Sequence, residues 1–374
     1  MSSDVEPFRA IGLSQLARQL RQEGRDVIQM EFGQPSAGAP TLAVDAAKSA
    51  LEATLPGYWQ SEDLKDRLAA LYRDEHGVSV DPSRIFLTCG ASPALVLALT
   101  CAFKPGDRIA MARPGYVAYR NTLKGLFLEP VEIRTGAETR FQLTAEMIAA
   151  LQPAPQGVII ASPSNPTGAI IPPGDFAEIA SVCERRGIRI ISDEIYHQLT
   201  YGTPTVSALR YAPDAFVINS FSKYYCMPGW RVGWMVAPED KQVAAASRIG
   251  NFFLTSPSLS QVAALAALDA KEELDGHLTL YAHNRDIMLE RLPRLGLSEM
   301  APPDGAFYIY ANVGRYTDDS LAFCEHILRE TGVVLAPGVD HDPDLGRSHV
   351  RFCFAMETGR INAALDRLET VLKP

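Results

Sequence analysis

The residues best suited to chemistry lie in one short stretch that ends at Arg231. Lys223 follows an apolar segment at 216–219, with serines at Ser220 and Ser222 before it. A lysine at the end of a buried strand is partly desolvated, so its pKa falls and its amine can attack a carbonyl. Serine hydroxyls and an arginine fork suit a phosphate dianion. Pyridoxal 5'-phosphate needs both a Schiff-base lysine and a phosphate anchor. A surface Ser/Lys loop is the alternative for this stretch taken alone.

Three polar residues upstream suit the ring of such a cofactor. Asp193 follows an apolar segment, and its carboxylate can pair with a pyridinium nitrogen and so favour a carbanion at the substrate. Tyr196 and Asn165 can hydrogen-bond the phenolic oxygen of the ring. Asn165 lies between two prolines, which make its turn rigid. A capping aspartate and simple turn chemistry are the alternatives for Asp193 and Asn165.

Three further positions suit the phosphate, the ring face and a substrate carboxylate. Residues 90–92 (Gly90, Ala91 and Ser92) open a helix whose free N–H groups favour an anion. Tyr116 follows Pro-Gly, where its ring can stack on a cofactor. Arg351 lies in an apolar segment, where its charge is costly unless a carboxylate pairs with it. An ordinary capped helix, a core tyrosine and a structural salt bridge are the alternatives.

The elements that must position these residues are predicted from the pattern after residue 85. Short apolar segments that do not alternate with polar residues are followed by helices, which is typical of a parallel sheet buried on both faces. In such sheets ligands gather beyond the carboxyl ends of the strands. The candidate residues all follow the ends of predicted strands: Gly90, Tyr116, Asn165, Asp193 and Lys223.

The order of predicted helices and strands changes towards the C-terminus, where an α+β pattern begins after a long predicted helix. We therefore expect two domains: a large one at 41–285, and a smaller, discontinuous one made of 1–40 and 286–374.

The composition excludes several kinds of partner. The chain has 374 residues, a formal net charge of −9 and no basic stripe, so neither nucleic acid nor an anionic membrane is an expected partner. The six cysteines lack C-x-x-C spacing, and the histidines form no metal-spaced pair with them, so no metal site is predicted. A polar, acidic N-terminus and the absence of a long apolar run predict a cytoplasmic protein without a signal peptide or membrane span.

Taken together and in order, these landmarks resemble the class I/II aminotransferases of fold type I, which use pyridoxal phosphate. The resemblance covers nearly the whole chain and rests on Gly33 with Pro35, Gly90-Ala91-Ser92, Tyr116, Asn165-Pro166-Thr167-Gly168, Asp193-Glu194-Ile195-Tyr196, Ser220-Phe221-Ser222-Lys223, Arg231 and Arg351. It implies an α/β fold, with a mostly parallel seven-stranded sheet flanked by helices in the large domain and a smaller α+β domain.

The resemblance also implies a role for each landmark. Lys223, Asp193 and Tyr196 would be the catalytic residues. The cofactor would be bound by Gly90, Ala91, Ser92, Tyr116, Asn165, Asp193, Tyr196, Ser220, Ser222, Lys223 and Arg231, and by Tyr58 of a partner subunit. The substrate carboxylate would be held by Gly33, Asn165 and Arg351. Family members are usually homodimers, so a homodimer acting on a small amino acid and a 2-oxo acid is expected.

The implied reaction is ping-pong transfer of an amino group from an L-amino acid to a 2-oxo acid. Relatives specific for dicarboxylates place a second arginine in a segment similar to 248–253. The closest register puts Asn251 there, with Arg248 nearby, and Phe252 and Phe253 favour a neutral or aromatic substrate. A C–S β-lyase on the same fold is the first alternative. A non-catalytic regulator is the second, although such proteins usually carry a DNA-binding extension.

Three positions depart from the family pattern. Cys226 takes the place of a smaller residue, with little expected effect. The segment after Tyr58 looks shorter than usual, which weakens the assignment of that tyrosine. His341 stands where an aromatic such as phenylalanine is expected, and we expect it to alter the rim of the site.

Overall fold

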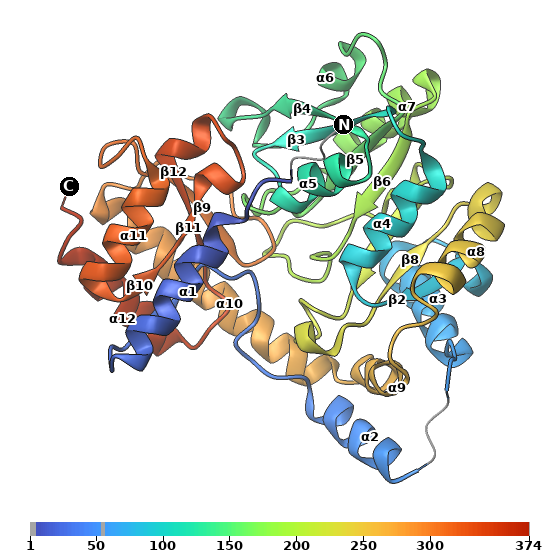
Figure 1. The fold of residues 1–374 in the computed structure, drawn as a ribbon, viewed down its shortest axis with the longest axis horizontal. Coiled ribbons are helices and arrows are strands. Elements are labelled where there is room, and N and C mark those ends of the chain that lie inside the picture. Colours follow the sequence, from blue (N-terminus) through green and yellow to red (C-terminus); the bar gives the residue numbers. More distant parts are fainter. Residues whose placement is uncertain (1–4, 54–56, 374) are drawn as a thin grey trace.

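The computed structural model describes residues 5–53 and 57–373, which form two parts (Figure 1). The long helix α10 (Lys271–Arg291) runs from the larger part to the smaller one. Near the N-terminal end of the chain, α1 (Arg9–Gln22) lies against the smaller part, where it contacts α11 (Ser320–Thr331). The polar N-terminal residues Met1–Asp4 and the turn residue Pro56 lie outside the described residues.

The larger part is built on a sheet of seven strands. Their spatial order is β2 (Ile85–Thr88), β8 (Gly233–Val236), β7 (Phe216–Ser220), β6 (Arg189–Asp193), β5 (Gly157–Ala161), β3 (Arg108–Arg113) and β4 (Glu129–Arg134). Strand β8 is antiparallel to both of its neighbours, and the other pairings are parallel. The predicted seven-stranded, mostly parallel sheet is therefore confirmed.

Both faces of this sheet are buried. In β5, Val158 and Ile160 pack into one core, whereas Ile159 packs into the other. In β6, Ile190 and Ile191 divide in the same way. Successive side chains of a strand point to opposite faces, so a strand covered on both sides is apolar at every position. This explains the runs without alternation in the sequence.

The helices of the larger part follow from their apolar spacing and caps. They are α2 (Thr41–Glu52), α3 (Glu62–His76), α4 (Ala91–Ala102), α5 (Val117–Gly125), α6 (Ala145–Ala149), α7 (Pro173–Arg186), α8 (Gln242–Phe252) and α9 (Ser258–Ala267). In α3, Leu64, Leu68 and Tyr72 recur every fourth residue and form its buried face. The helix begins where the side chain of Ser61 accepts a hydrogen bond from the Leu64 N–H at 3.2 Å.

The smaller part joins residues from both ends of the chain. Near the N-terminus, β1 (Ile28–Gln29) pairs in parallel with β10 (Val333–Val334). A separate antiparallel sheet has the order β11 (Ala336–Pro337), β12 (His349–Cys353) and β9 (Tyr308–Asn312), and α12 (Thr358–Glu369) packs nearby. The predicted boundary at residue 285 falls inside α10, and the limits of the two domains stay a prediction.

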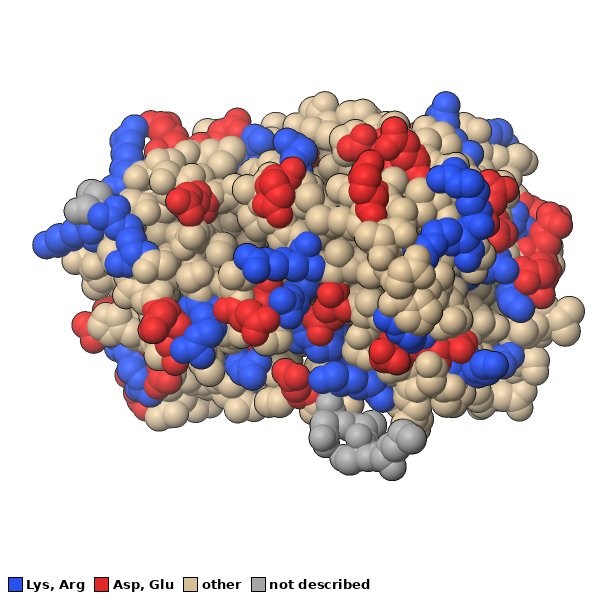
Figure 2. All heavy atoms as spheres, turned by 90° about the horizontal axis from the view of Figure 1, so that it is seen from above, with Lys and Arg blue, Asp and Glu red and all other residues tan. Residues whose placement is uncertain are grey.

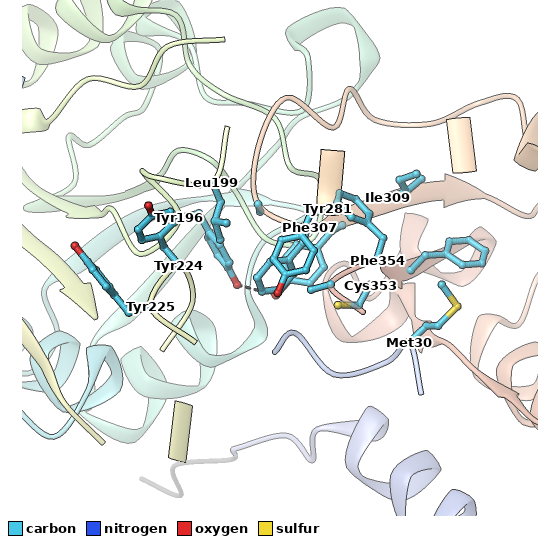
Figure 3. Close-up of a cluster of buried hydrophobic side chains, with 14 of the residues drawn as sticks. Met30, Tyr196, Leu199, Tyr224, Tyr225, Tyr281, Phe307, Ile309, Cys353 and Phe354 are labelled. Carbon is cyan, nitrogen blue, oxygen red and sulfur yellow. Dashed lines mark hydrogen bonds between the residues drawn. The ribbon is translucent and has the colours of Figure 1, made fainter. Parts of the chain in front are cut away.

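An aromatic cluster joins the two parts (Figure 3). The ring of Tyr196, from the loop after β6, meets the ring of Phe307 edge-on at 5.7 Å, and Phe307 lies 6.1 Å from Tyr281. The hydroxyl groups of Tyr196 and Tyr308 are hydrogen-bonded at 2.7 Å. The loop that carries Tyr196 is thus anchored to β9 of the smaller part.

The surface carries charges of both signs. Figure 2 shows Lys and Arg side chains interspersed with Asp and Glu side chains over one face. None of the helices in the described ranges is long and apolar enough to span a membrane.

Candidate active site

A cavity of about 320 Å³ opens beyond the carboxyl ends of the central strands. The loops after β2, β3, β5, β6 and β7 all contribute to it, and so does the smaller part. Of the residues predicted for the site, those that line this cavity are Gly33, Ala91, Ser92, Tyr116, Asn165, Asp193, Tyr196, Ser222, Lys223, Arg231 and Arg351. Four of the five residues expected at strand ends therefore lie together at this cavity, namely Tyr116, Asn165, Asp193 and Lys223.

Lys223 lies in the loop that follows β7. Burial is the main cause that lowers the pKa of its amine, to about 8. The amine donates a hydrogen bond to the backbone carbonyl of Gly33. It also lies 5.7 Å from the centre of the Tyr196 ring and 6.0 Å from that of Phe307. A lysine in this setting can present a neutral, nucleophilic amine near neutral pH.

Asp193 is the last residue of β6, so it ends the strand that it was expected to follow. Its Oδ2 accepts a hydrogen bond from the hydroxyl of Tyr119 at 2.6 Å, and its Oδ1 accepts one from the N–H of Ile195 at 3.2 Å. Burial raises the pKa of this carboxyl group above its ordinary value. A buried carboxyl group that lines a cavity is suited to a cationic N–H from a ligand.

The opposite end of the cavity is rich in hydrogen-bond donors. The hydroxyls of Ser220 and Ser222 lie 2.9 Å apart, and α4 begins at Ala91, with its free N–H groups at this end. Arg231 donates to the carbonyl of Cys89 at 3.0 Å. A Cβ atom on Gly90, whose φ is +98°, would lie 2.6 Å from Nη2 of Arg231. Glycine at residue 90 therefore leaves room for the arginine.

Arg351 is only 2% exposed, and it reaches the cavity from β12. Its Nη1 donates to Oδ1 of Asn165 at 2.7 Å, and its Nη2 donates to the carbonyl of Glu31. Its guanidinium lies 4.4 Å above the ring of Tyr308. Among the described residues its Nε has no hydrogen-bond partner. The charge is held in place without a contacting carboxylate, as a receptor for an anionic ligand requires.

Three predicted residues stand apart from the cavity wall. Ser220 and Gly90 lie behind it, where they contact Ser222 and Arg231. Tyr58 is 85% exposed and does not line the cavity of its own chain. The expectation that His341 alters the rim is wrong, because His341 is buried behind the cavity, where its Nδ1 lies 3.1 Å from the carbonyl of Gly115.

Sequence reasoning missed several residues of the wall, namely Phe8, Glu31, Phe32, Tyr119 and Tyr308. Tyr119 had a signal, because it lies three residues after Tyr116 and so on nearly the same face of α5. The two rings meet edge-on at 5.4 Å. The others come from the smaller part, whose docking no local pattern reveals.

Comparisons with known proteins agree with this geometry. Residues 25–368 match the family described as aminotransferase class I and II. The chain belongs to this family. It is 45% identical to the valine–pyruvate aminotransferase of Mycobacterium tuberculosis, over 98% of this chain and 97% of that one. A crystal structure of an aminotransferase from the same organism has a TM-score of 0.96 at 45% identity, covering 99% of this chain and 97% of that one.

A more distant relative has the same architecture. The aspartate aminotransferase of Thermus thermophilus, solved with maleate, has a TM-score of 0.91 at 29% identity and covers 98% of this chain and 97% of that one. This aminotransferase family acts on amino acids and 2-oxo acids. The chain is therefore a transaminase, and the reaction is the transfer of an amino group from an amino acid to a 2-oxo acid.

Proposed function

We propose that this aminotransferase binds pyridoxal 5'-phosphate in the cavity, with Lys223 as the residue that joins it covalently. Three features of the cavity fit the group. A lysine of lowered pKa stands between a buried carboxyl group, Asp193, and a donor-rich end formed by Ser222, Arg231 and the start of α4. The carboxyl group suits a pyridinium N–H, and the donors suit a phosphate.

The cofactor, when bound, supplies the ring that withdraws electrons from the substrate α-carbon. The chain supplies the rest. Asp193, held by Tyr119, would place a carboxylate at the ring nitrogen. The Nζ atom of Lys223, once free, would accept the α-proton of the substrate as a general base and return it as a general acid. Asn165 and Tyr196 would donate hydrogen bonds to the phenolic oxygen.

Arg351 is the proposed anchor of the substrate α-carboxylate, assisted by Asn165 and the backbone of Gly33. A buried guanidinium with an unpartnered Nε can give a carboxylate a second, parallel hydrogen bond. This contact would orient the substrate amino group towards Lys223, so that the reacting atoms are held close together.

The proposed donor has a neutral, apolar side chain. The cavity wall includes Phe8, Phe32 and Ile195, and its cations among the described residues are Lys223, Arg231 and Arg351, each with a role above. A side-chain carboxylate would thus lack a partner within this subunit. In α8, Asn251 is exposed, and Arg248 donates to the carbonyl of Ala244 at 3.3 Å. The relative from M. tuberculosis, named for valine and pyruvate, supports the same class.

We further propose a homodimer in which Tyr58 completes the phosphate site of the partner subunit. The exposure of Tyr58 supports this, because a large aromatic group open to solvent is often an interface residue. We also propose two domains, a large one at 41–285 and a smaller one made of 1–40 and 286–374. The proposed location of the protein is the cytoplasm.

The visible spectrum of the purified protein tests the function. The protein should be yellow, lose this colour with L-valine and recover it with pyruvate, whereas L-aspartate should act far more slowly. Release of pyruvate and ammonia from a β-substituted substrate, without that reversible change, would favour the lyase. A Lys223→Ala protein that still gives the reversible colour change would contradict the role of Lys223.

A further inference from the structure

A cluster of three metal-binding side chains lies behind the cofactor cavity. It consists of His76, the last residue of α3, and Glu194 and His197 from the loop after β6. One ligand atom from each residue lies within 4.8 Å of the other two. Glu194 and His197 are buried, whereas His76 is only partly buried. The cluster therefore has a closed side and a side open to solvent.

The carboxyl group of Glu194 is fixed so that one oxygen remains free. Its Oε1 accepts hydrogen bonds from the hydroxyls of Ser192 at 3.2 Å and Ser207 at 3.1 Å, and from the N–H of Ala208 at 2.8 Å. In the described part of the chain, its Oε2 has no hydrogen-bond partner. A fully buried oxygen without a partner is costly unless a ligand fills the gap.

His197 is oriented in a similar way. Its Nδ1 has no hydrogen-bond partner within the described ranges and lies 3.4 Å from Oε2 of Glu194. An imidazole nitrogen without a partner can bind a metal ion. The ring of His76 stands edge-on to that of His197, with 5.2 Å between their centres.

The distance within the cluster decides between two interpretations. Nδ1 of His197 lies 3.4 Å from Oε2 of Glu194. Two ligands that each lie about 2.0 Å from a tetrahedral zinc ion are about 3.3 Å apart. An O–H group on a neutral Glu194 that donated to the imidazole would place the two atoms at about 2.7 Å. The observed separation is compatible with a shared ion and is longer than such an O–H···N hydrogen bond.

We infer that His76, Glu194 and His197 form a binding site for a divalent transition-metal ion of the zinc type, with a water molecule in the fourth position. Two imidazoles and a carboxylate are ligands that Zn²⁺ accepts. Tyr72 lies beside the trio, with its ring 5.9 Å from that of His76. The partly exposed His76 provides the route of entry.

Burial raises the pKa of Glu194 to about 8 and lowers the pKa of His197. A metal ion binds these groups only in their deprotonated forms. The ion would also tie the end of α3 to the loop after β6, which directly follows Asp193 and carries Tyr196. The site is therefore a structural support for the cofactor pocket, and it takes no part in the reaction.

Cobalt(II) provides the test because its tetrahedral complexes absorb in the visible region. The purified protein with its cofactor is stripped of metal with a chelator, dialysed and titrated with Co²⁺, and the difference spectrum is recorded. We expect one Co²⁺ per chain, a tetrahedral band, its displacement by Zn²⁺, and a Zn²⁺-dependent rise in melting temperature. His76→Ala should abolish all four effects, and the matched change of an exposed histidine far along the chain, His283→Ala, should leave them intact.

His76 is partly exposed, so its variant should fold. A second variant, Glu194→Gln, keeps the shape and the Oε1 acceptor while it removes the charge, and it should weaken Co²⁺ binding at least tenfold. Absence of the band in the unmodified protein would overturn the proposal. Equal Co²⁺ binding by the unmodified and His76→Ala proteins would also overturn it, because the ion would then be bound elsewhere.

Discussion

Replacement of Arg351 by lysine keeps the charge and removes the planar fork. Arg351 donates to Asn165 at 2.7 Å and to the carbonyl of Glu31, and it stacks 4.4 Å above Tyr308. A lysine cannot make these contacts and also give a substrate carboxylate two parallel bonds. The loss of one charge-assisted hydrogen bond costs about 1.5–3 kcal/mol, which lowers kcat/KM roughly 10- to 150-fold.

The assay compares two amines in single-turnover reactions followed by the colour of the cofactor. L-Valine carries the α-carboxylate, and isobutylamine is the same molecule without it. Arg351→Lys should slow the reaction of valine by the factor above and leave that of isobutylamine within about twofold. Arg285→Lys is the matched control, because Arg285 also stacks on a tyrosine, Tyr201, at 5.4 Å, but lies outside the cavity wall. Equal slowing of both amines would refute the assigned contact.

Three further changes probe the cofactor end of the site. The rate at which the cofactor-free protein takes up pyridoxal phosphate should rise with pH and level off above about 8, the pKa of Lys223; a continued rise towards 10.5, the value of an ordinary lysine, would contradict the effect of burial. Gly90→Ala should push Arg231 aside and weaken cofactor binding about tenfold or more by spectroscopic titration, while Gly38→Ala, which meets nothing within 4 Å, should not. Tyr119→Phe removes a donor to the buried aspartate and should raise the cofactor dissociation constant about tenfold in equilibrium dialysis; an unchanged constant would contradict this support.

The arrangement of the sheet was predictable because its physical cause is local. The run 157–161 is apolar at every position, and Ile190 and Ile191 continue the pattern in β6; only a strand covered on both faces tolerates such adjacent apolar residues. Once the strands were parallel, their carboxyl ends had to meet at one edge. Asn165, Asp193 and Lys223 could therefore be placed near one another without a structure.

Contacts between segments distant in sequence were not predictable in this way. Tyr308 comes from β9 and reaches Tyr196 only because the smaller part docks on the larger. His76 and His197 are far apart in sequence, and only folding brings α3 beside the loop after β6. The position of His341 was predicted wrongly for a related reason. The sequence shows that a histidine replaces the expected aromatic residue, but it does not show whether the side chain points into the cavity or away from it.

The segment that follows β1 contributes to the site through its backbone, which side-chain patterns in the sequence do not reveal. Lys223 donates to the carbonyl of Gly33, and Arg351 donates to the carbonyl of Glu31. Two functional side chains are thus oriented by backbone oxygens that any residue would provide. The exception is Gly33 itself, because a Cβ atom there would lie 2.0 Å from the hydroxyl of Tyr308. A glycine in such a segment records how closely another side chain approaches, so it signals a backbone contact even though it has no chemistry of its own.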